Sequence, residues 1–89
     1  MNIQLKDHTA GPVYMQIREQ IEAQIRNKQV RAGEALPSPA LLAQKLSVDK
    51  GEVQRAYHEL ERSGLVKRAT SKNFLGEEKV SYLIEGTTP

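Results

Sequence analysis

The chain has 89 residues, of which 38% are hydrophobic, and carries a formal net charge of +2. This length suits one small domain with one modest core, so a single domain over residues 1–89 is expected. The absence of cysteine excludes disulfides and thiolate metal sites, and the two histidines lie far apart in the sequence. With no nucleophile motif, phosphate loop or paired-carboxylate pattern, the sequence predicts no metal, no cofactor and no enzymatic activity.

The amino-terminal segment lacks the apolar core of a signal peptide, and no apolar run approaches the roughly 18 residues that a membrane span needs. A cytoplasmic protein with no membrane partner is therefore expected. Ile3 and Leu5 alternate with polar residues, which favours a short edge strand followed by a polar turn at residues 7–11.

A first amphipathic helix is predicted after Pro12. Apolar side chains recur every four residues along one face of it, and they are Val13, Ile17, Ile21 and Ile25. The helix is expected to end near Asn27. After a further turn, Leu36 is placed to act as a short strand or to fill the core.

Two short helices joined by a tight turn are predicted between residues 38 and 63, which is the arrangement of a helix-turn-helix. Ser38 can cap the first of them, with Pro39 at the first helical position, where its missing N–H costs nothing. Asp49 is expected to cap the second, and Glu52 completes an acidic capping box. The predicted buried faces of the two helices consist of Leu42, Ala43 and Leu46, and of Val53, Ala56, Tyr57 and Leu60.

A β-hairpin is predicted to follow the helices. It is expected to cover residues 65–75, with short strands at 65–66 and 73–75 and a basic tip between them. A further segment of alternating polarity has its apolar side chains at Val80, Tyr82 and Ile84. The order of elements predicts a small α+β fold with an amino-terminal strand, three helices and a hairpin.

Several motifs follow one another in a characteristic order. They are PVYMQI at residues 12–17, Gly33 before Leu36, LPS followed by LLAQKL, V-x-x-x-x-V-x-R-A-Y-x-E-L-E from residue 48, and GLV. In this order the chain resembles the DNA-binding domain of GntR-type bacterial regulators over roughly residues 3–75, and its opening is most similar to the short-regulator branch. The resemblance implies a winged helix-turn-helix that regulates transcription on double-stranded DNA.

The chain differs from the family pattern at three places. Its second helix opens with Ser38, Pro39 and Ala40 where the family has Ser-Glu-Arg. The third helix opens with DKGE at residues 49–52, which keeps a cation at the position of the family's arginine and adds two carboxylates. At the expected wing tip, residues 70–72 are TSK where the family has Gly-x-Gly.

Candidate DNA-binding residues lie on the predicted third helix and the hairpin. A recognition helix places its amino-terminal turn in the major groove, where Gln54 can pair with adenine and Lys50 or Arg55 can bind guanine or phosphate. Glu52 can accept from a cytosine amino group, or it can cap the helix. An ordinary solvated surface would contain the same residue types. The full set of candidates is Ser38, Lys50, Glu52, Gln54, Arg55, Lys67, Arg68, Ser71, Lys72 and Asn73.

The residues are compatible with two functions. The favoured one is a GntR-type DNA-binding transcriptional regulator, with the helix at residues 49–63 in the major groove and the basic wing at 67–73 on the backbone or in the minor groove. The alternative is a protein-protein interaction module, motivated by the missing arginine and the added carboxylates. We expect no small-molecule effector domain after the hairpin, and the alternating strands are candidate edges for a homodimer or a protein partner.

Overall fold

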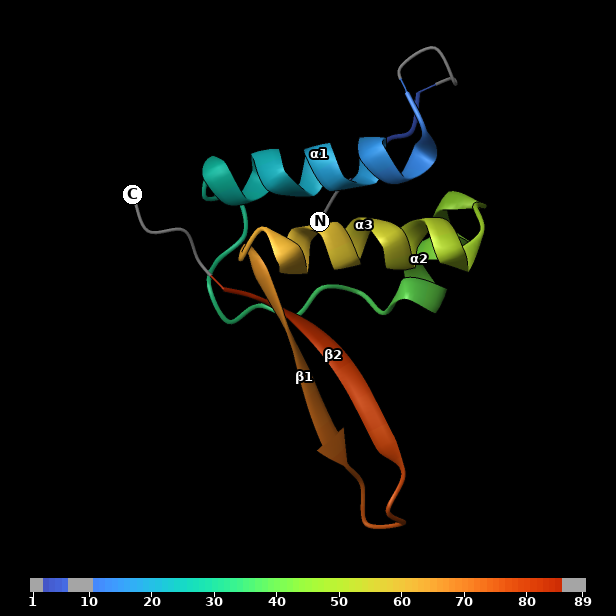
Figure 1. Cartoon of the computed structure of the whole chain (residues 1–89), viewed down its shortest axis with the longest axis vertical. Helices are drawn as coiled ribbons and strands as arrows, with labels where there is room; N and C mark the ends of the chain where they lie inside the picture. Colours follow the sequence, from blue (N-terminus) through green and yellow to red (C-terminus); the bar gives the residue numbers. More distant parts are fainter. Residues whose placement is uncertain (1–2, 7–10, 86–89) are drawn as a thin grey trace.

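The computed structural model describes residues 3–6 and 11–85. In this part of the chain, three helices precede an antiparallel hairpin, and the elements are α1 (Val13–Arg26), α2 (Pro39–Leu46), α3 (Lys50–Arg62), β1 (Val66–Lys72) and β2 (Glu78–Ile84). α3 packs between α1 and α2, and the hairpin projects from its carboxyl end (Figure 1). The predicted α+β fold, with three helices and a wing, is confirmed.

The core lies where α1, α2 and α3 meet. The apolar residues predicted on the inward faces of α1 and α3 are buried, except Val13, which is partly buried against the core, because a four-residue spacing keeps side chains on one side of a helix. Leu36 is also buried and fills the space beside the base of the hairpin, as predicted. The fully buried side chains with the largest volumes are Tyr57, Ile17, Ile21, Leu60, Val53 and Val66.

The helix-turn-helix has the predicted start. The Ser38 hydroxyl oxygen accepts from the backbone N–H of Leu41 at 3.2 Å, and Pro39 is the first residue of α2. The turn into α3 passes through Ser47, whose backbone is left-handed with φ 58. The N–H of Val48 then donates to the carbonyl of Ala43 at 3.0 Å, which closes the end of α2.

Tyr57 holds α3 to the segment that enters α2. Its hydroxyl donates to the carbonyl of Pro37 at 2.7 Å, and its ring meets that of Tyr82 edge to face, with the ring centres 5.0 Å apart. Burial, with a smaller effect of Tyr82, raises the pKa of the Tyr57 hydroxyl above its ordinary value. One buried side chain therefore links α3, the segment that enters α2, and the wing.

The hairpin is longer than predicted. β1 and β2 pair from Val66 opposite Ile84 to Lys72 opposite Glu78, so the basic residues lie on a strand and the tip loop is at residues 73–77. The predicted strands at 65–66 and 73–75 are wrong. The side chains of β1 are exposed on both faces over most of its length, so the apolar alternation that predicts a strand is missing. The alternating segment that ends at Ile84 is confirmed as β2.

The described amino-terminal residues form no strand. The N–H of Gln4 donates to the side-chain oxygen of Gln20 at 2.9 Å, and that of Lys6 to the side-chain oxygen of Gln16 at 2.7 Å. Both acceptors belong to α1. The edge strand predicted around Ile3 is therefore wrong, because these backbone groups bond to side chains of a helix instead of a neighbouring strand. Of the polar turn predicted at residues 7–11, only Gly11 lies within the described residues.

Candidate nucleic-acid interface

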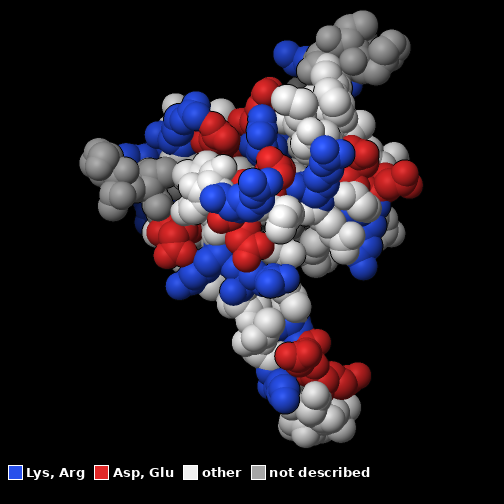
Figure 2. All heavy atoms as spheres, in the orientation of Figure 1, with Lys and Arg blue, Asp and Glu red and all other residues white. Residues whose placement is uncertain are grey.

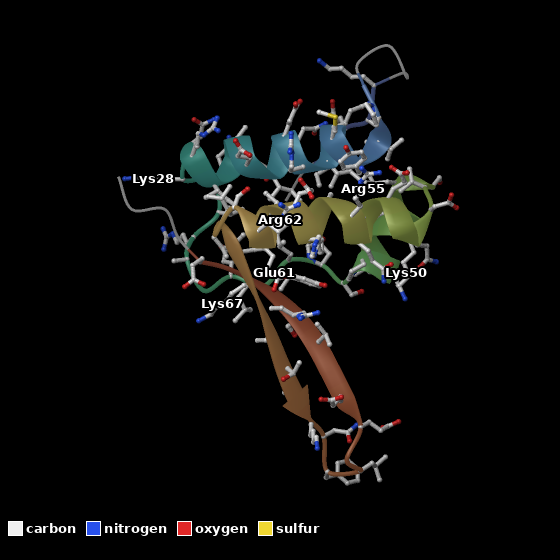
Figure 3. All side chains as sticks on the ribbon, in the orientation of Figure 1. Lys28, Lys50, Arg55, Glu61, Arg62 and Lys67 are labelled. Atoms are coloured by element: carbon white, nitrogen blue, oxygen red, sulfur yellow. The ribbon has the colours of Figure 1, made fainter. Side chains whose placement is uncertain are left out.

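α3 has two polar sides that the packing separates (Figure 3). We call Glu52, Arg55 and Glu59 the α1 side, because all three contact residues of α1. We call Lys50, Gln54, His58 and Glu61 the open side, because it borders the region between α3 and the hairpin. The apolar residues of α3 lie between these sides, against the core.

Glu52 caps α1 instead of its own helix. Its Oε2 accepts from the N–H of Tyr14, in the first turn of α1, at 3.0 Å. The N-cap residue Pro12 forms no side-chain bond to that turn, so Glu52 supplies an acceptor that the free amides of α1 need. The predicted capping box is wrong, since Asp49 also makes no side-chain cap bond. Glu52 is thus committed to a contact between α1 and α3 through two residues that are 38 positions apart in sequence.

The other residues of the α1 side are engaged as well. The Arg55 guanidinium carbon lies 3.9 Å from the centre of the Tyr14 ring, a cation–π contact. Glu59 lies 3.9 Å from a guanidinium nitrogen of Arg18 and 3.5 Å from one of Arg62. The α1 side is therefore occupied by interactions within the protein.

The open side has both free and paired groups. Lys50 and Gln54 are exposed, and their side chains make no hydrogen bond or ion pair with another described residue. One Glu61 oxygen lies 4.0 Å from Nδ1 of His58, and the other lies 4.0 Å from Nε of Arg68 on β1. Glu61 therefore joins the open side to the base of the wing. His58, which is not among the residues predicted to bind DNA, belongs to this side because it lies one turn after Gln54.

The strand register divides the cations of the wing between two faces. Residues paired across an antiparallel ladder share a face, and alternate residues take opposite faces. Val66 and Ile84 are buried in the core, so their face turns toward the helices, and Arg68 and Lys72 share it. The opposite face carries Lys67, Ser71 and Lys79.

Asn73 shapes the tip loop. Its Oδ1 accepts from the N–H of Leu75 at 2.9 Å and from that of Glu77 at 3.0 Å. Its Nδ2 donates to the Glu77 carboxylate at 2.8 Å. With both ends of the amide in use, Asn73 serves the conformation of the loop, and we do not include it in the DNA surface.

Among the predicted DNA-binding residues, Lys50 and Gln54 are exposed on the open side of α3, and Arg68 and Lys72 lie on the wing face that turns toward the helices. Ser38 caps α2, while Lys67 and Ser71 lie on the far face of the wing. Lys and Arg gather over the helices and the base of the hairpin, with acidic residues between them (Figure 2). Charge alone therefore does not mark the site; the candidate surface follows from the exposed open side of α3 and from the strand register of the wing.

The described residues contain no group of three or more His, Cys, Asp or Glu side chains that could hold a metal ion. In the same ranges, no helix is long and apolar enough to cross a membrane.

Three helices with a two-stranded wing define a winged helix-turn-helix protein. The family model for bacterial regulatory proteins of the gntR family matches residues 13–74. The chain belongs to the GntR family of transcription regulators. Because the match includes α1, both helices of the motif and β1, it covers the elements that build the candidate interface.

Relatives of known name agree with this assignment. The chain is 32% identical over 77 residues to the uncharacterized HTH-type transcriptional regulator YhcF, and 29% identical over 85 residues to the HTH-type transcriptional repressor YtrA, both of Bacillus subtilis. These alignments cover 86% and 94% of the chain but only 64% and 65% of the relatives, so the chain spans less than two thirds of their length.

A solved structure matches almost the whole chain. YtrA from Sulfolobus acidocaldarius, a GntR-family transcription factor, superposes with a TM-score of 0.77 at 27% identity. The match covers 97% of this chain and 82% of that one. The overall fold of the described chain is therefore similar to that of a regulator of the same family.

Proposed function

We propose that this domain binds double-stranded DNA to regulate transcription, with the open side of α3 in the major groove and the helix-facing side of the wing along the backbone. The observation that carries the proposal is that Lys50 and Gln54 are exposed on the open side of α3 and have no partner within residues 3–6 and 11–85, and that Arg68 and Lys72 share the wing face that turns toward the helices. Residues that can contact bases and residues that can contact phosphates are thus exposed on α3 and on the adjoining wing face, respectively.

Lys50 and Gln54 have complementary tasks in this arrangement. Lys50 is the first residue of α3, at the helix end that enters the groove, and its ammonium group can bind phosphate or guanine. Gln54 lies one turn further along the same side, where its amide can donate to and accept from an adenine edge. Lys50 therefore contributes mainly affinity, and Gln54 contributes sequence preference.

Gly51 supports a close approach of α3 to DNA. A glycine inside a helix costs about 1 kcal/mol relative to alanine, yet a Cβ at residue 51 would meet no atom within 4 Å. Its φ is not in the left-handed region, so nothing in the fold requires glycine there. Because residue 51 has no side chain, the backbone of α3 at this point can come nearer to the base edges.

The acidic residues near α3 do not oppose this assignment equally. The Glu52 carboxylate is bonded to the amide of Tyr14, and Glu59 lies between two arginines. Their charge is therefore largely balanced within the protein, and both lie on the α1 side. Of the two added carboxylates that suggested a protein-interaction module, Glu52 is thus engaged within the protein, while Asp49 is exposed and makes no side-chain cap bond.

A titration at two salt concentrations tests the proposal. Fluorescence anisotropy with random-sequence duplex DNA should show affinity that falls steeply as salt rises. Three phosphate contacts, from Lys50, Arg68 and Lys72, give a slope of log K against log salt of about −2.7 per protomer. Selection of preferred duplexes then identifies the operator. Absence of binding, or binding indifferent to salt, would contradict the proposal.

Such a regulator works in the cytoplasm, where bacterial DNA lies, and has no catalytic role. A homodimer would present two copies of α3 to two half-sites about 34–36 Å apart. Sedimentation at high micromolar concentration, with and without the selected duplex, tests this pairing. A monomer under both conditions would contradict it.

A further inference from the structure

Two apolar side chains project from the tip loop of the hairpin. Phe74 is 95% exposed and Leu75 is 68% exposed. Phe74 is the single phenylalanine of the chain, and the fold leaves it out of the core. Burial of apolar surface is a main source of binding energy. Neighbouring exposed apolar residues of this kind therefore indicate a surface that binds a partner.

The tip loop is ordered by its own hydrogen bonds. In addition to the side-chain bonds of Asn73, the N–H of Asn73 donates to the carbonyl of Glu77 and the N–H of Gly76 donates to the carbonyl of Asn73, both at 3.0 Å. Gly76 adopts a φ of +81°, which the turn needs and glycine adopts at little cost. Phe74 and Leu75 are therefore presented on a preorganised loop, which lowers the cost of inserting them into a partner.

The wing is long enough to carry this tip to the neighbouring groove of a bound duplex. β1 contains 7 residues, and at about 3.3 Å per residue it extends roughly 20 Å from the helices. A minor groove lies half a helical turn, about 17 Å, from the centre of the major groove on the same face. The hairpin is therefore long enough for its tip to reach the minor groove when α3 lies in the major groove.

The acidic residues next to the tip loop do not place a negative charge beside Phe74 and Leu75. The Glu77 carboxylate is turned into the loop by its bond to Asn73. Glu78 lies opposite Lys72 in the strand register and shares a face with it, so these two side chains together add no net charge to that face. The far end of the hairpin consists of uncharged side chains, with acidic and basic residues behind them (Figure 2).

We propose that Phe74 and Leu75 form an apolar wedge that enters the minor groove and partly unstacks one base step. The proposal rests on the DNA binding proposed above. Exposed Phe and Leu side chains of minor-groove proteins open base steps in this way and kink the duplex. Pyrimidine-purine steps such as TA and CA unstack most easily, so the wing selects such a step without a hydrogen bond to any base.

The test compares the unaltered protein with two variants on the selected duplex. The duplex carries 2-aminopurine at each pyrimidine-purine step in turn, and a fluorescence donor and acceptor at its ends. F74S/L75S removes the wedge, while Phe74→Leu keeps an apolar side chain and is the matched control. Since these side chains are outside the core, thermal unfolding of both variants should match that of the unaltered protein.

The wedge predicts a rise in 2-aminopurine fluorescence and a shorter end-to-end distance with the unaltered protein and with Phe74→Leu. F74S/L75S should lose both signals and about tenfold in affinity, with an unchanged salt slope because no phosphate contact is lost. Both signals persisting with F74S/L75S would overturn the wedge. The wedge would also be overturned if the unaltered protein sedimented as a dimer and F74S/L75S as a monomer while both DNA signals stayed the same. The tip would then be a contact between two copies of the chain.

The failure of the wedge is distinguishable from that of the proposed function. An unaltered protein that binds DNA with the expected salt slope but neither unstacks nor bends it overturns the wedge alone. An unaltered protein that binds no duplex overturns the proposed function and the wedge together.

Discussion

The two polar sides of α3 contain similar residues but serve different purposes. On the α1 side, Glu52 and Arg55 both bind the first turns of α1, through the amide and the ring of Tyr14. On the open side, Lys50 and Gln54 have no partner among the described residues. Adjacent positions of one helix therefore divide into residues that hold the helix in place and residues that the helix presents.

This difference explains how the chain can lack the family's arginine at Ala40 and carry added acids without losing a credible DNA surface. One of the acids stabilises the packing of α3 on α1, so its cost to DNA binding is reduced. The orientation of α3 thus depends on residues of the α1 side, while affinity and specificity depend on the open side and the wing. Substitutions on the two sides should have separable effects.

The largest expected effect comes from the open side. Lys50→Glu should lower the affinity for every duplex about 50-fold at low salt, because it removes a phosphate contact and adds a repulsive charge. Anisotropy titration measures this. Lys28→Glu, the same charge change at the exposed far end of α1 (Figure 3), is the control and should have only a small effect. Equal losses in both variants would show that net charge, and not the open side, determines binding.

A smaller effect, on the free energy of unfolding, is expected at Tyr57, the buried residue that holds α3 to the segment before α2. Tyr57→Phe leaves the carbonyl of Pro37 without its donor and should lower the free energy of unfolding by about 1.5 kcal/mol. Urea denaturation measures this, with Tyr14→Phe as the control that keeps its ring against Arg55. An equal loss in both variants would contradict the role of the hydroxyl bond.

The pKa of Tyr57 gives the same bond a pH dependence. Because burial raises its pKa above the ordinary value of 10.0, the folded state favours the protonated hydroxyl. Its contribution to stability is complete below pH 10 and is lost as pH rises above it. Tyr57→Phe should remove this decrease in stability at alkaline pH, as measured by urea denaturation at a series of pH values. If the variant and the unaltered protein showed the same dependence of stability on pH, Tyr57 would not be its cause.

The smallest effect on DNA binding is expected on the α1 side. Glu52→Ala should lower the free energy of unfolding by about 1 kcal/mol, since the N–H of Tyr14 loses its acceptor. Its DNA affinity should change less than about threefold. Glu52→Gln keeps an acceptor oxygen and should recover part of the stability. A variant with normal stability but a changed preference for cytosine would show instead that Glu52 reads a base.

The helices could be predicted because their signals are local. The four-residue spacing of isoleucines, Ser38 before Pro39, and the apolar stripe around Tyr57 each lie within one element. β1 gave no such signal, because a strand exposed on both faces needs no alternation of apolar residues. A turn signal was present at Asn73 to Gly76, whose side-chain bonds and left-handed glycine close the loop.

The candidate site could be predicted only as a set of residue types. Lys50 and Gln54 were found from their helix positions, but the partners of Glu52 and Arg55 belong to α1 and depend on how the two helices pack. The separation of Lys67 from Arg68 and Lys72 depends on the strand register, which the sequence misplaced. The residues that bind within the protein therefore became distinguishable from the presented ones only in three dimensions.

The most direct test of this account compares two pairs of wing cations. R68A/K72A and K67A/K79A each remove two positive charges from the hairpin, the first pair from the face toward the helices and the second from the opposite face. Anisotropy titration across salt concentrations should show a slope reduced by about 1.8 for R68A/K72A and unchanged for K67A/K79A. Equal reductions, or a reduction only for K67A/K79A, would contradict the assignment of the DNA surface to the open side of α3 and the wing face beside it.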